Sequence, residues 1–280
     1  MFIRIALLMV MLIISMSSHA WTSPSKKEEM VDRVLTLSGT KTAMRYVSSQ
    51  IARGFHSARE MSDLRMSRQE MTPEQRKSLE HLLKVMRGSF DHDAMLKTAA
   101  AYLADNTTEK QLAAAIGHLS KKEVRRIIGL EIKAMNSASK NVLNDFAHAL
   151  QIRKPSPLRM TIVDHIDRIT EASRHSADLA MEIFGAFFQS NPAHMERLRA
   201  IINKQARDQT ILTLLYAYRN LTDRELQEYA LIYQDEDYAW VARMTVRGVN
   251  VAIKHAFDEF KGSLVEWVTN EMETAGRRSF

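Results

Sequence analysis

The side chains with the greatest capacity for chemistry gather in one short stretch of the C-terminal half. Five of the seven tyrosines lie there together with one tryptophan: Tyr216, Tyr218, Tyr229, Tyr233, Tyr238 and Trp240. Both residue types combine a large apolar body with a polar tip, which suits an apolar pocket with a polar mouth. Arg243 is near enough in sequence to bind an anion there, as are Arg219 and Arg247. The pattern predicts a ligand-binding site formed by these tyrosines, Trp240 and Arg243.

The same aromatic residues have a second interpretation as packing residues. Leu226, Tyr229, Ala230 and Tyr233 recur with the period of a helix face that is buried. Aromatic side chains on such a face pack in a core more often than they hold a ligand. The sequence leaves the pocket and the core as alternatives.

Other kinds of chemistry lack a complete set of residues. The acidic runs Asp235-Glu236-Asp237 and Asp91-His92-Asp93 are typical of helix starts and do not have the spacing of a calcium loop. Met61, Met66 and Met71 could offer thioethers to Cu(I), but a five-residue spacing does not align them on one helix face. The sequence contains no nucleophile elbow, Walker loop or dinucleotide fingerprint. We therefore expect no cofactor, no metal and no catalytic residue.

Helices are the elements that must position these side chains, because the 280 residues include only 9 glycines and 5 prolines. Capping boxes, in which a Ser or Thr precedes a Glu or Gln by three residues, begin at Ser25, Thr72, Thr108, Ser120 and Thr222. In the first half we expect helices over about 26–38, 42–60, 73–87, 93–104, 109–119 and 121–150. Gly39 and Gly88 are expected to end the first and third of these helices.

The chain contains an internal repeat. Residues 30–58 align with residues 162–190 at an offset of 132, and residues 106–150 align with 220–264 at an offset of 114. We predict a first copy over residues 21–150, a proline-containing linker over 151–157 and a second copy over 158–280. The predicted fold is all-α: two related multi-helix units that form a pseudo-symmetric helical bundle or a short superhelical array.

The N-terminal end predicts export. Residues 1–20 have a charged start, an apolar run and small residues before a cleavage site, which indicates a signal peptide cleaved after Ala20. We expect a periplasmic protein without a transmembrane span after signal removal. The chain has no cysteine, so disulfides and thiolate chemistry are excluded. The net charge of +6 is spread along the chain without a basic block, which argues against nucleic acid as a partner.

The capped helix at Thr222-Asp223-Arg224-Glu225-Leu226, followed by Tyr229 and Tyr233, resembles a bacterial family known as domain of unknown function 2059. Members of that family are exported, all-helical proteins of Gram-negative bacteria. The resemblance implies an envelope location and an all-α fold, and it brings no catalytic residues. The chain departs from the family pattern at Gln234-Asp235-Glu236-Asp237, where the family has a glycine-containing turn.

Export, a helical scaffold and the lack of a catalytic set together favour a non-enzymatic periplasmic protein. We expect it to bind a partner protein or an envelope component through its helical surface. One alternative is a small-molecule or lipid carrier that uses the aromatic pocket of the second copy. Another is an envelope hydrolase with an unrecognised site. The sequence identifies neither the partner nor the oligomeric state.

Overall fold

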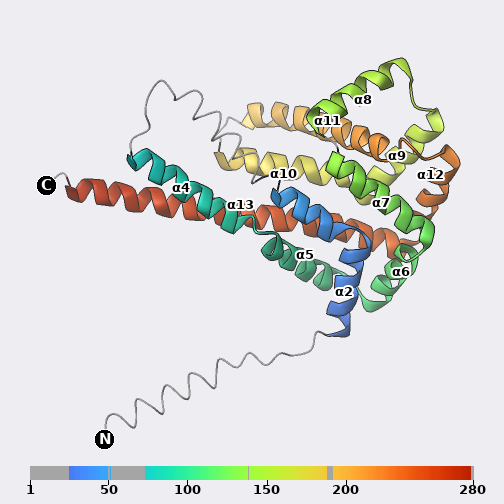
Figure 1. Ribbon diagram of the computed structural model, residues 1–280, viewed down its shortest axis with the longest axis horizontal. Helices are drawn as coiled ribbons and strands as arrows, with labels where there is room; N and C mark the ends of the chain where they lie inside the picture. The colour runs from blue at the N-terminus through green and yellow to red at the C-terminus, as the bar shows by residue number, and fades with distance from the viewer. Residues whose placement is uncertain (1–24, 50, 52–72, 138, 188–191, 279–280) are drawn as a thin grey trace, which may run out of the picture.

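The computed structural model describes residues 25–49, 51, 73–137, 139–187 and 192–278, which fold into helices without a strand among them (Figure 1). The all-α prediction is confirmed. The predicted signal peptide of residues 1–20, its cleavage site at Ala20 and the segment Met61–Met71 lie outside the described residues. So do the capping box predicted at Thr72 and residues 52–60 of the second predicted helix. Across the part of the chain that is described, none of the helices combines the length and the apolar character needed to cross a membrane.

Eleven α-helices and one 3₁₀ helix have defined bounds within the described ranges. They are α2 (Lys26–Leu37), α4 (Pro73–Ser89), α5 (His92–Asn106), α6 (Glu109–Leu119), α7 (Lys122–Ser137), α8 (Lys140–Ile152), α9 (Pro157–Thr170), α10 (Ala172–Phe187), α11 (Pro192–Ala217), α12 (Asp223–Ala230), η1 (Leu231–Gln234) and α13 (Glu236–Arg278). Residues 40–49 are helical as well.

Three of the predicted capping boxes form as expected. Ser25, Thr108 and Thr222 each accept a hydrogen bond from the backbone N–H three residues later, and the side chain of that later residue bonds back to the cap. The box predicted at Ser120 is wrong. Ser120 has helical dihedrals and donates its N–H to the carbonyl of Ile116 at 2.9 Å, so it ends α6. A residue with helical backbone cannot adopt the extended conformation that an N-cap requires.

One predicted helix end is also wrong. Gly88 lies inside α4, which ends at Ser89, and the following turn is fixed instead by Asp91 at the N-cap of α5. A single glycine inside a helix costs only about 1 kcal/mol, which packing overrides.

The helix expected over 121–150 is divided into α7 and α8. The side chain of Ser139 caps α8 by accepting the N–H of Val142, and Ser137 accepts the N–H of Ser139 through its carbonyl. In the second copy the offset of 114 places Val251 and Ile253 at these two positions, and α13 runs through them unbroken. Serine competes for backbone hydrogen bonds and favours a cap, whereas valine and isoleucine cannot.

Helix α13 is the central element of the fold and runs along most of the molecule (Figure 1). It contacts α4, α5 and α6 from the first predicted copy and α9 and α10 from the second. In return, α7 and α8 of the first copy contact α11 of the second. The two predicted copies are therefore interlocked, because each contributes its last helices to the other.

Two apolar clusters form the core along α13. The larger cluster includes Tyr238, Val241 and Met244 from the start of α13. The smaller cluster joins Ala252, Ala256 and Phe260 of α13 to α4, α5 and the helix at 40–49. Gly248 lies between them, where an added Cβ would be 3.1 Å from the carbonyl oxygen of Ala99. Its missing side chain allows α13 and α5 to approach closely.

Left-handed backbone follows both α2 and α9. Gly39 has φ +76° and Glu171 has φ +53°, and these positions coincide at the repeat offset of 132. Glycine adopts this conformation freely, whereas a glutamate does so at a cost. The shared turn agrees with a duplication, which stays a prediction at the level of the whole fold.

Candidate functional site

The five tyrosines of the predicted site lie in the core where α11, α12, η1 and α13 meet. Tyr218 is only 1% exposed, and Tyr216, Tyr229, Tyr233 and Tyr238 are also buried. Tyr218, Tyr229, Tyr233 and Tyr238 form a chain of neighbouring rings whose centroids are 5.2–6.0 Å apart. The edge-on geometry of these contacts is favourable for aromatic pairs. The tertiary structure therefore gives these residues a packing role.

The polar tips of two of these tyrosines meet a carboxyl group from α7. The hydroxyl of Tyr218 donates to Glu131 Oε1 at 2.5 Å, and the hydroxyl of Tyr229 donates to the same oxygen at 3.2 Å. Burial raises the pKa of Glu131, although the two hydrogen bonds oppose this effect. Burial also raises the pKa of Tyr233, to about 12. The sequence analysis missed Glu131, because it lies 87 residues before Tyr218 and no local pattern joins them.

Trp240 and Arg243 connect α13 to other helices. Trp240 is 37% exposed and donates its indole N–H to the carbonyl of Asn106, at the end of α5. Arg243 donates to the carbonyl of Ile169 at 3.1 Å, near the end of α9, and lies 3.8 Å from a carboxylate oxygen of Glu171. Both side chains thus stabilise contacts between helices.

The other two arginines proposed for an anion also have partners. Arg247 Nη2 lies 2.9 Å from Glu171 Oε2, and its Nε donates to His175 Nε2 at 3.1 Å. Burial would raise the pKa of Glu171, but the hydrogen bond from Arg247 and the nearby positive charges outweigh it and hold the pKa below its usual range. Arg219 lies over the ring of Tyr216, with its guanidinium carbon 3.8 Å from the centroid. Binding of a ligand among the tyrosines stays a prediction, and the packing interpretation has the support of these contacts.

Three carboxylates of the two acidic runs, at 91–93 and 235–237, have partners within the protein. Asp235 accepts the N–H of Tyr238 at 2.9 Å and pairs with His118 at 3.1 Å. Asp237 pairs with Lys110 at 2.8 Å, and Asp91 caps α5. Within the described ranges, no group of three or more His, Cys, Asp or Glu side chains converges as metal ligands would.

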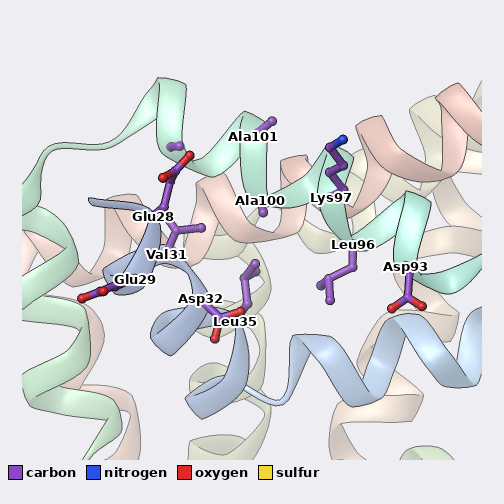
Figure 2. Close-up of a pocket in the computed structure, with 11 residues that line it drawn as sticks. Glu28, Glu29, Val31, Asp32, Leu35, Asp93, Leu96, Lys97, Ala100 and Ala101 are labelled. Atoms are coloured by element: carbon purple, nitrogen blue, oxygen red, sulfur yellow. The ribbon is translucent and has the colours of Figure 1, made fainter. Parts of the chain in front are cut away.

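An open groove lies between α2 and α5, on a surface that the sequence analysis did not select. Its volume is about 690 Å³, within the usual size range of ligand pockets. The apolar part of its lining comes from both helices: Val31, Leu35, Leu96, Ala100, Ala101 and Ala104. Figure 2 shows the side chains of Leu35 and Leu96 extending into the space between the two helices. Such a surface can bury the apolar face of a ligand.

Acidic side chains border this apolar floor. Glu28, Glu29 and Asp32 belong to α2, and Asp93 belongs to the first turn of α5. In Figure 2, Glu28 and Glu29 lie at one end of the groove and Asp93 lies at the other. Lys97 is the single basic residue of the lining, so four carboxylates face one ammonium group.

Two of the four carboxylates already have a structural task. Glu28 accepts the backbone N–H of Ser25, and this hydrogen bond lowers its pKa. Asp32 pairs with Lys41 at 2.5 Å. Glu29 and Asp93 lie at the two ends of the groove and are both exposed to solvent, and Asp93 Oδ1 also lies 3.2 Å from His92 Nε2. Their exposure leaves both carboxylates accessible to a ligand.

Fold and groove together define a class: an all-helical protein with an apolar, acid-bordered surface groove. No family model, curated protein or solved structure matches the chain. The resemblance to domain of unknown function 2059 therefore rests on the residues around Thr222 and stays a prediction.

Proposed function

We propose that this protein is a non-enzymatic periplasmic binding protein, and that it holds a partner protein or an envelope component in the groove between α2 and α5. The observation that supports this proposal best is the groove itself, where Ala101 is exposed and Leu96, Ala100 and Ala104 are partly exposed above the buried side chains of Val31 and Leu35. Contiguous exposed apolar surface on a soluble protein marks interaction sites, because it carries a hydration cost that binding removes.

Ala101 is a suitable position at which to test this proposal. It is exposed, lies on α5 and lines the groove. A photo-reactive amino acid at Ala101 should form an adduct with the bound partner in intact cells. The same substitution at Ala113, an exposed alanine of α6 outside the groove lining, serves as the matched control. We expect one defined adduct from position 101 that position 113 does not give.

The same cells test the proposed location. Fractionation should release the chain with the periplasm, and its N-terminal sequence should begin at Trp21. If position 101 gives no adduct beyond that of position 113, the groove is not the binding surface. Recovery of the unprocessed chain in the cytoplasm would contradict the periplasmic assignment.

The carrier hypothesis has a separate test. A carrier that uses the tyrosines should co-purify with an apolar ligand, visible by native mass spectrometry and lost on Tyr229→Ala or Tyr233→Ala. Because both side chains are core residues, circular dichroism must show that each variant remains folded. The hydrolase hypothesis has no residue on which to base a variant.

A further inference from the structure

The acid-bordered groove is set in a protein of opposite overall charge. The chain has a net charge of +6, whereas the groove lining has four carboxylates and one lysine. Resting on the proposed function, we infer that the groove binds a cationic amphipathic helix of a partner protein. The apolar face of that helix would lie on the floor of the groove, and its Lys or Arg side chains would face Glu29 and Asp93.

The walls of the groove favour a helix over an extended peptide. Both walls are α-helices, whose backbone N–H and C=O groups are bonded within the helix except at the ends. An extended peptide would find no strand edge with which to pair, so its own backbone groups would lose water without compensation. A helix satisfies its backbone internally and presents one apolar face, as in other helix-in-groove complexes.

The dimensions of the groove also suit a helix. Helix α2 has 12 residues, which corresponds to a length of about 18 Å or roughly three turns. Ala100, Ala101 and Ala104 make the α5 wall shallow, so that a helix backbone can approach α5 closely. Leu96 supplies the larger accessible apolar side chain between the two walls, and Leu35, which is only 1% exposed, lies beneath the floor.

The position of the acids determines the charge of the occupant. Glu29 and Asp93 lie at opposite ends of the apolar floor (Figure 2), so a ligand that covers the floor must pass beside both. An anionic ligand would meet like charge at each end, which disfavours binding and slows encounter. Lysine and arginine side chains can cover apolar surface with their stems while their charges reach these carboxylates.

The test uses three fluorescent peptides of about 14 residues, long enough to cover the groove. One is an amphipathic helix of leucine and lysine, the second replaces lysine with glutamate, and the third has the leucine and lysine residues of the first in a scrambled order. Fluorescence anisotropy should detect binding of the first peptide only. Affinity should fall as salt is added, because exposed charges are screened over about 8 Å at physiological ionic strength.

Variants of the groove assign the binding to its residues. Ala101→Trp should weaken binding of the cationic peptide at least about tenfold by filling the groove, whereas Ala113→Trp on α6 should not. Glu29→Gln together with Asp93→Asn should weaken binding about three- to tenfold and reduce the salt dependence. Glu123→Gln together with Glu236→Gln removes two exposed first-turn acids of α7 and α13 and should have no effect.

The outcomes separate this inference from the proposed function. If the acidic peptide binds as well as the cationic one, or if the Glu29/Asp93 variant binds normally, the inference about charge is overturned. If the scrambled peptide binds equally, the inference of a helix is overturned. If no peptide binds, the inference fails as a whole, while an adduct at position 101 would still support the groove as a binding surface.

Discussion

Replacing Gly39 with alanine tests how the turn after α2 fixes this helix, and with it one wall of the groove. Gly39 is buried and has φ +76°, a conformation that costs an L-residue about 1–2 kcal/mol. A Cβ at this position would lie 2.9 Å from Ile132 Cδ1 and 3.3 Å from Ile128 Cγ2. Real Cβ atoms do not approach so closely, so Ile132 would have to move.

The expected size of the effect follows from these terms. Because the nearest atom is the end of a side chain, we expect the crowding to cost about 1 kcal/mol, the lower end of the usual range for overpacking. Alanine also restricts the unfolded chain, which stabilises the protein by about 0.4–1 kcal/mol. We expect Gly39→Ala to lower the free energy of unfolding by about 2 kcal/mol, or the Tm by about 4–8 °C for a chain of this length.

Urea and thermal denaturation followed by circular dichroism would measure this change. Gly117→Ala is the matched control, because Gly117 lies within α6 and an added Cβ would meet nothing within 4 Å. That substitution should stabilise the protein by about 0.5–1 kcal/mol. Ile132→Val removes Cδ1 but leaves Cγ1 at 3.1 Å, so in its presence Gly39→Ala should lose only part of the roughly 1 kcal/mol of crowding. A Gly39→Ala protein as stable as the parent would refute the account of this turn.

Two further predictions concern polar groups that are buried or partly buried. Because burial raises the pKa of Glu131, the fold favours its protonated form; this contribution to stability is complete below the ordinary pKa and is lost as the pH rises through the folded value. Glu131→Gln keeps an acceptor for Tyr218 but cannot titrate. In urea denaturation from about pH 4 to about pH 8, its free energy of unfolding should therefore decline less with pH than that of the parent. An identical decline would contradict the protonation of Glu131 in the fold. Arg159 is only 16% exposed in its side chain, lies 2.7 Å from Asp223 Oδ1 and donates to the carbonyls of Tyr218 and Leu221. Arg159→Ala should cost about 1–2 kcal/mol in urea denaturation, because Asp223 is 33% exposed in its side chain and keeps its hydrogen bond from Ser156. Arg159→Lys should recover only part of the loss because lysine lacks the planar fork; full recovery by lysine would show that the charge alone matters.

Local signals in the sequence predicted the helices well because each depends on residues three or four positions apart. The boxes at Ser25, Thr108 and Thr222 formed because both partners lie within one turn. The prediction failed at Gly88, where packing outweighs the cost of a glycine within a helix. It failed again at Ser137–Ser139, where serine side chains and carbonyls compete for the backbone and divide the helix.

The candidate site was much less predictable. The tyrosine cluster stood out because five members lie within 23 positions, from Tyr216 to Tyr238, yet their buried partner Glu131 comes from α7. The groove lining was not selected in the sequence analysis. Asp93 and Leu96, on the α5 wall, are about 60 positions away from the α2 wall in the chain, and no spacing rule connects them to α2.

The sequence by itself determined an all-helical chain, most helix starts and the apolar face of each helix, because hydrogen bonds within a turn and a 3.6-residue period are local properties. Only the tertiary structure decided that α13 packs on the helices of the other predicted copy, that the tyrosines are enclosed and that α2 and α5 leave a groove open. These outcomes depend on how all the helices pack their apolar faces against one another, and that packing involves residues far apart in the chain.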